Sequence, residues 1–280
     1  MKIPVKFSKG EKIFLGIFFA AYAGVAIWNF GKVEFPSGIA HVWQIKVPLP
    51  SILGTLNPMT IIMTALLLVI LIYMAFDFKR HLKKIPSRKQ SAIELVLSFM
   101  YDLVKDVTPA EEFVRPVFYI ATTLFLFILF SNILGGIPGI GVGVSPNGSL
   151  KLNLFTDTWH SPTGDLNTNV TYAVMVLFIS HIFAIKLKGL KEWAKGFISP
   201  NPIMLPMNII GEFAKPISHS LRLFGNIAGG GIMVLMLSYL VKYTFVPVIL
   251  WGFFGFFVGT IQAFVFSILA IAYIGIQLEQ

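Results

Sequence analysis

Long apolar stretches separated by short polar segments dominate this chain. A helix needs about 20 apolar residues to cross the hydrocarbon core of a bilayer, and six stretches approach that length. They are residues 13–31, 58–78, 116–137, 169–185, 205–241 and 246–276. The pattern predicts an all-α polytopic membrane protein with about six transmembrane helices. The last two stretches are long enough for their helices to tilt strongly.

A shorter segment, residues 91–108, repeats apolar residues with a helical period. Its apolar side contains Ile93, Val96, Leu97, Met100, Leu103, Val104 and Val107. This periodicity predicts an amphipathic helix on the inner membrane surface. Two explanations fit it equally well: a helix that rests on lipid headgroups, and a surface on which a partner docks.

Composition and charge support the membrane assignment. The chain of 280 residues is 56% hydrophobic and only 12% charged, which is far from the average soluble protein. Its net charge of +9 follows the positive-inside rule, because with a cytoplasmic N-terminus the outer loops hold only Lys32, Lys46, Lys151 and Lys242. The basic charge therefore indicates topology rather than a nucleic-acid partner. It predicts cytoplasmic termini for a protein of the inner (plasma) membrane.

The first apolar stretch has two interpretations. Lys9 and Lys12, followed by the apolar run Ile13–Ile27, are typical of a signal peptide and also of a first membrane helix. We favour a retained helix. This divides the chain into an N-terminal helix with an outer loop, residues 1–57, and a main domain, residues 58–280.

No cofactor is expected. The chain has no cysteine, which excludes disulfides, thiolate metal sites and cysteine nucleophiles. It also has no phosphate-binding loop and no zinc-ligand spacing. A catalytic site of its own is therefore not predicted, and a metal ion is expected only as transient Na⁺.

Arg222 is the residue that stands out, because it lies well inside the apolar stretch 205–241. A charged side chain at the centre of a bilayer costs at least about 2.5 kcal/mol and usually marks an ion or substrate path. The alternative is an arginine near a helix end that extends to the headgroups. Its depth in the stretch favours the path.

Polar residues flank Arg222 at helical spacing. Asn226 follows it by four residues and His219 precedes it by three, so a helix places them on one face. Glu212 and Asn208 lie nearer the inner end of the same stretch. Because Glu212 is turned about 80° from Arg222 on an ideal helix, it is expected to attract cations to an inner vestibule rather than to gate the path.

The segment Lys215–Asn226, KPISHSLRLFGN, resembles the KPxSLxLRLFGN signature of subunit a from the membrane sector of F-type ATP synthases. His219 departs from the leucine that is common at its position. Further similarities are Ala92–Val96, Asn132 with Pro138, Asn169–Thr171, Ile185–Gly189 and Gln262–Phe264. The resemblance covers about residues 90–276, whereas residues 1–57 resemble nothing identifiable.

The resemblance implies a stator subunit, not itself an enzyme, that conducts ions through two offset half-channels to the carboxylates of a rotating c-subunit ring. Arg222 would stand between the half-channels, and the b subunits of the peripheral stalk and the soluble ATPase sector would be further partners. Gln262 would lie close to the arginine, although a polar contact between helices explains a membrane glutamine equally well. The residues expected to line the half-channels or to orient the arginine are Asn132, Asn208, Glu212, Ser218, His219, Asn226 and Gln262.

Two glycines bear on the coupling ion. Many members of the family carry ionisable residues where this chain has Gly231 and Gly255. Without those side chains the outer half-channel should be wider and wetter, which suits hydrated Na⁺ at least as well as H⁺. The sequence therefore slightly favours Na⁺, the alternative being that these glycines serve helix packing.

Two other classes of protein were considered. A secondary transporter or channel would use Arg222 to bind an anion, but the sequence shows no internal repeat. A quinone-linked respiratory subunit would need paired intramembrane histidines or a longer chain of acids. Neither pattern is present.

Overall fold

The computed structural model describes residues 55–144, 150–198, 201–240 and 252–279, together with isolated positions before residue 47 and at 249–250. Four helical stretches in this part of the chain are long and apolar enough to cross a membrane. They are α2 (Pro58–Arg80), α4 (Glu111–Gly135), α5 (Leu166–Lys188) and Phe253–Glu279, which comprises the turn η3 (Phe253–Val258) and α9 (Gly259–Glu279). The prediction of an all-α polytopic membrane protein is confirmed.

Of the other two predicted spans, the structure describes only one as a helix. The stretch 205–241 forms α7 (Leu205–Leu240), a helix of 36 residues. The stretch 13–31 lies almost entirely outside the described residues, as does most of the proposed N-terminal segment 1–57.

Local chemistry accounts for the ends of the helices. Asn57 caps α2, because its Oδ1 accepts a hydrogen bond from the Met59 backbone N–H at 3.0 Å. Asp165 caps α5 in the same way, accepting from the Asn167 N–H at 3.0 Å. At the other end of α5, Gly189 adopts a φ of 86°, which glycine tolerates without steric cost.

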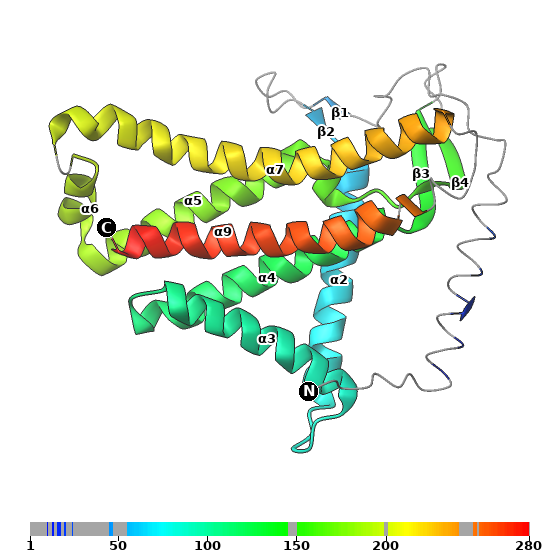
Figure 1. Ribbon diagram of the computed structural model, residues 1–280, viewed down its shortest axis with the longest axis horizontal. Coiled ribbons are helices and arrows are strands. Elements are labelled where there is room, and N and C mark those ends of the chain that lie inside the picture. The colour runs from blue at the N-terminus through cyan, green and yellow to red at the C-terminus, as the bar shows by residue number, and fades with distance from the viewer. Residues whose placement is uncertain are drawn as a thin grey trace.

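The helices form one elongated bundle (Figure 1). α7 and α9 run along its length, α5 packs against both, α4 packs on α9, and α2 crosses the others steeply. The predicted amphipathic segment is the helix α3 (Arg88–Val107), which buries Met100 and Val104 toward its contacts with α4 and α9. The centre of the core consists of Val117, Ala121, Ile128, Ala263, Phe266, Ile271 and Ile274.

Two antiparallel hairpins were not predicted from the sequence. β3 (Pro138–Val144) pairs with β4 (Leu150–Thr158), and β1 (Ile45–Lys46) pairs with β2 (Thr55–Leu56). The apolar residues of β4 at positions 150, 152 and 154 alternate with polar ones. This is the period of a strand, and it could have predicted β4.

Short elements connect the long helices at the two ends of the bundle. After β4, the turn η1 (Pro162–Gly164) leads into α5, close to the end of α4. We call this the outer end, following the predicted topology. At the inner end, α6 (Leu190–Gly196) and η2 (Pro202–Met204) connect α5 to α7, and α9 terminates.

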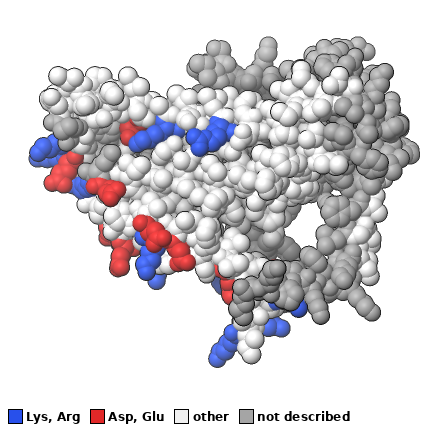
Figure 2. All heavy atoms as spheres, viewed as in Figure 1, with Lys and Arg blue, Asp and Glu red and all other residues white. Residues whose placement is uncertain are grey.

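Charged side chains are distributed unevenly over the molecule (Figure 2). They gather over the regions of α3, α6 and the α2–α3 turn, whereas the visible face along α7 has few of them. A mostly apolar face of this kind suits contact with lipid or with another membrane protein.

Candidate functional site

Arg222 lies on an exposed side of α7, whereas its neighbours Ser220 and Leu223 are buried in the bundle. No ion pair joins its guanidinium to the part of the chain that the structure describes. The large apolar side chains Ile217 and Leu221 are also exposed beside it. A permanent charge on an apolar face favours a nearby counter-charge, and the described residues form no ion pair with it.

This side of α7 is flat where its glycines lie. A Cβ built on Gly225 or Gly229 would meet no atom of the described residues within 4 Å. Among these residues, the two glycines therefore do not pack helices together. They leave open space next to Arg222.

The structure brings Asn226 and Gln262 together. Asn226, on α7, donates from Nδ2 to Oε1 of Gln262 at 2.5 Å. Gln262 is buried on α9, and its Nε2 has no hydrogen-bond partner among the described residues. The Gln262 amide thus lies on α9 opposite Asn226, which is one helical turn from Arg222 on α7.

His219 packs against α9. It is buried, its Nε2 lies 3.0 Å from the Phe266 carbonyl oxygen, and its ring stacks on Phe266 with centroids 3.7 Å apart. His219 and Arg222 are neighbours on α7, but the His219 side chain is buried against α9 whereas Arg222 is exposed. A role of His219 in a half-channel stays a prediction. Ser218 is exposed on the lipid or partner side.

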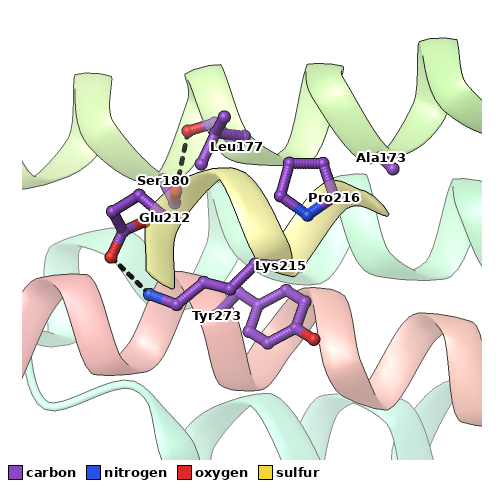
Figure 3. A pocket seen from close by; sticks show the side chains of 7 residues that line it. All are labelled: Ala173, Leu177, Ser180, Glu212, Lys215, Pro216 and Tyr273. Carbon is purple, nitrogen blue, oxygen red and sulfur yellow. Dashed lines mark hydrogen bonds and ion pairs between the residues drawn. The ribbon is translucent and has the colours of Figure 1, made fainter. Parts of the chain in front are cut away.

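A cluster of polar and charged side chains lies at the inner end (Figure 3). Oε1 of Glu212 pairs with Lys215 Nζ at 2.5 Å and accepts from Gln277 Nε2 at 2.7 Å. His181 Nε2 lies 3.5 Å from Glu212 Oε2, which is an ion-pair distance but makes no hydrogen bond. We call His181, Glu212, Lys215 and Gln277 the inner charged cluster. It joins α5, α7 and α9.

A small hollow opens beside the inner charged cluster. In Figure 3, Lys215 extends between Glu212 and Tyr273, and its Nζ lies 5.9 Å from the centroid of the Tyr273 ring. The hollow is lined by Ala173, Leu177, Ser180, Glu212, Lys215, Pro216 and Tyr273. The predicted residue Asn208 connects the start of α7 to the preceding loop. Its Nδ2 donates a hydrogen bond to the Phe197 carbonyl at 2.9 Å.

Neutral polar side chains gather at the outer end. Asn132 is buried, donates from Nδ2 to the Gly259 carbonyl at 2.8 Å and accepts at Oδ1 from Thr163 Oγ1 at 2.7 Å. Thr163 also lies within hydrogen-bond distance of two serine hydroxyls. Asn169 donates to the Thr163 carbonyl at 2.8 Å, while its own buried Oδ1 has no partner in the described chain. The outer polar cluster is Ser131, Asn132, Ser161, Thr163 and Asn169.

The sequence identified only part of these two clusters. Asn132 and Glu212 were predicted, but Gln277, Ser131, Ser161 and Thr163 were not singled out. Serine and threonine are common at helix ends and in turns, so their composition gave no signal. Gln277, a polar residue directly after the last apolar stretch, was the one that the sequence could have indicated.

The two glycines of the coupling-ion argument differ. A Cβ on Gly231 would meet no described atom within 4 Å, whereas one on Gly255 would lie 2.5 Å from the Cα atom of Gly136. Close packing of two backbones explains Gly255. The expectation that its missing side chain opens a channel is therefore wrong, and Gly231 alone borders open space.

Comparison with known proteins gives the family. The family described as ATP synthase A chain matches residues 58–275. ATP synthase subunit a of Anoxybacillus flavithermus is 34% identical over 229 residues, covering 78% of this chain and 91% of the relative. The subunit a of Alkalihalophilus pseudofirmus is 31% identical over 250 residues (84% and 98%), and that of Moorella thermoacetica 34% over 216 residues (77% and 88%).

These matches span the helices that carry Arg222 and both polar clusters, and they favour neither the secondary transporter nor the quinone-linked subunit. The chain belongs to the ATP synthase subunit a family, the ion-translocating membrane subunits of ATP synthases.

Proposed function

We propose that this chain provides two offset half-channels to the carboxylates of a c-subunit ring, with Arg222 between them. The observation that supports this is the placement of Arg222, exposed and without an ion pair in the described chain, between two polar clusters. Glu212 precedes it on α7 by ten residues, or about 15 Å toward the inner end. Asn226 and Gln262 lie one turn toward the outer end.

Arg222 acts on a carboxylate that the ring brings past it. A nearby cation favours the ionised form of that carboxylate and so promotes release of its bound proton or Na⁺. The same charge repels a cation that would otherwise move directly from one half-channel to the other. Rotation of the ring then becomes the route of lowest barrier.

The outer half-channel follows the outer polar cluster inward. From Thr163 the path passes Asn132 and the Gly259 carbonyl, and Gln262 lies one turn further along α9. The inner half-channel follows the hollow at Glu212, which attracts cations to the inner vestibule. Both paths approach α7, the helix that carries Arg222.

The partners follow from the same surfaces. The open strip of α7 with Ile217, Leu221, Gly225 and Gly229 faces the c-ring. The b subunits and the soluble ATPase sector complete the assembly, and ATP chemistry takes place in that sector rather than in this chain. The chain lies in the plasma membrane with both termini in the cytoplasm.

We infer a slight preference for Na⁺ over H⁺ as the coupling ion, which Gly231 supports and Gly255 does not. Gly231 still borders open space, and the path from Thr163 to Gln262 consists of neutral hydroxyl, amide and carbonyl groups. Oxygen atoms of this kind are suitable ligands for a hard cation. ATP hydrolysis by the intact complex should then rise with added Na⁺ at neutral pH. A response to pH alone would assign H⁺ instead.

The decisive experiment changes Arg222 in the complete complex, reconstituted in lipid vesicles. Arg222→Ala should leave assembly intact and abolish ATP-driven ion transport, because the exposed side chain supports no contact of the fold. Arg222→Lys should fail as well, since an ammonium lacks the planar donor array of a guanidinium. Normal coupled transport by either variant would overturn the proposal.

A further inference from the structure

The last helical stretch does not begin as a regular α-helix. Residues Phe253–Val258 form the π-helical turn η3, in which the Gly259 N–H points to the Phe254 carbonyl, five residues earlier. A π turn holds one residue more than the corresponding α turn, and such turns occur frequently at functional sites. Figure 1 shows η3 beside the hairpin β3–β4, at the outer end.

Residues at the start of this turn and after it contact α7. At its start, Phe254 covers Gly230, where a Cβ would lie 2.8 Å from Phe254 Cδ1. After it, Gln262 accepts the hydrogen bond from Asn226. Positions 254 and 262 must therefore face the same neighbouring helix.

In a regular α-helix the two positions would point in clearly different directions. Each residue advances an α-helix by about 100°, so positions eight residues apart differ by about 80° after two full turns. The extra residue held by the π turn removes about 100° from this sum. The two positions then lie within about 20° of each other.

The turn is also held by contacts with α4. Near the start of the turn, Gly255 packs against the backbone of Gly136, which directly follows α4. After the turn, Gly259 packs against Asn132 of α4, and its carbonyl accepts a hydrogen bond from Asn132 Nδ2 at 2.8 Å. Within the turn, the Phe256 carbonyl accepts from Thr260 Oγ1 at 2.5 Å. Side chains thus bond to carbonyls in and next to the turn, where α-helical pairing is interrupted.

We propose that η3 is a register device that absorbs one residue. Because of the extra residue, Phe254 can pack against Gly230, and Gly255 against Gly136, at the outer end. At the same time Gln262 keeps its hydrogen bond with Asn226, one turn from Arg222. Phe254 and Gly255 are positioning residues for the ion path. The consequence for transport rests on the proposed function, whereas the geometry can be tested without it.

The geometric test uses the full chain in its complex, which starts without cysteine. Two cysteine pairs report the two contacts with α7: Gly230→Cys with Phe254→Cys, and Asn226→Cys with Gln262→Cys. Each pair is joined with a short bifunctional thiol reagent in native membranes. Deleting Phe257, whose ring is exposed, should convert η3 into an α turn and keep both cross-links.

Inserting one alanine after Phe257 should have the opposite effect. The added residue rotates one side of the turn by about 100°, so at least one of the two cross-links should be lost. A matched deletion of Ala228, which lies between the two cross-linked positions of the regular helix α7, should cost a cross-link, because no extra residue is stored there. Retention of both cross-links after the insertion, or equal behaviour of the two deletions, would overturn the proposal.

Transport gives the second measurement, made on the chain without cysteines. ATP-driven ion transport should survive deletion of Phe257 and be lost on insertion of alanine. If deletion abolishes transport while both cross-links persist, the extra residue itself acts in the path and the register account is wrong. If even the unmodified complex transports no ion, the proposed function fails, but the cross-links still decide the geometry.

Discussion

The inner and outer ends of this bundle are polar in different ways. The inner charged cluster compensates a carboxylate with an ammonium, an amide and a nearby imidazole, and its His181, Glu212 and Lys215 side chains remain partly accessible. The outer polar cluster contains only hydroxyls and amides, and all its members are buried. On the proposed path, an ion would meet long-range charge at one end and only short-range hydrogen-bonding groups at the other.

This difference has a measurable consequence. Interactions between accessible charges are screened by salt over about 10 Å at 0.1 M, whereas buried neutral hydrogen bonds are not. Changes at the inner end should depend on ionic strength, and changes at the outer end should not. The predictions below compare the two ends on this basis.

The largest effect is expected at the outer end, where Gly255 touches Gly136. Gly255→Leu should prevent stable assembly, because overpacking costs about 1–3 kcal/mol or more and the obstructing atoms belong to backbone. The measurement is the amount of chain recovered in membrane complexes. Gly231→Leu is the control: it should assemble normally and slow ion transport, since its Cβ meets no described atom within 4 Å. Equal assembly of both variants would remove the distinction between the two glycines.

The next effect comes from the outer polar cluster. Asn132→Leu keeps the size of the side chain but leaves the Gly259 carbonyl without the Asn132 amide, while Thr163 Oγ1 keeps only its two serine neighbours. A buried group that loses its partner costs about 1–3 kcal/mol, which corresponds to about 10–100-fold. Transport per assembled complex should fall by that order at low and at high salt alike. A loss that disappears in high salt would show that this end acts through charge.

A smaller effect is expected at the inner charged cluster. Glu212→Gln removes the charge, keeps the shape and leaves Lys215 without its counter-ion. Because both side chains are mostly shielded but keep some access to water, at 15% and 23% exposure, loss of the pair should cost about 1.5 kcal/mol, or about tenfold in transport at low salt. The deficit should shrink as salt is added, and Glu212→Asp should retain most of the activity. A deficit that is constant over the salt range would mean that shape, not charge, matters there.

Much of the architecture could be predicted because membrane helices are encoded locally. About 20 apolar residues in a row are sufficient evidence of a span, and the helical period of 91–108 was enough to predict α3. The π turn could not be predicted in this way. It depends on which faces α4 and α7 present to residues 253–262, and that information is not local.

The same difference between local sequence signals and tertiary contacts applies to the candidate site. Arg222, Asn226 and Gln262 were predicted because a charge or amide inside an apolar stretch is conspicuous. Gly255 was misinterpreted, since a sequence cannot show whether the space left by a glycine is open or filled by another backbone. The outer polar cluster depends on η1 folding back beside α4, a tertiary contact that serine and threonine do not announce.

The smallest effect is expected at His219, whose side chain packs against α9 and not on the exposed side of α7 that carries Arg222. His219→Leu introduces the residue that is common at this position in the signature. It removes one hydrogen bond to the Phe266 carbonyl, worth about 0.5–1.5 kcal/mol, while a leucine still fills the space beside the Phe266 ring. Assembly should fall slightly on heating, and ATP-driven transport per assembled complex should be nearly unchanged over the whole pH range. A large transport loss, or a shifted pH profile with normal assembly, would place His219 in the ion path after all and make the inner half-channel pass between α7 and α9.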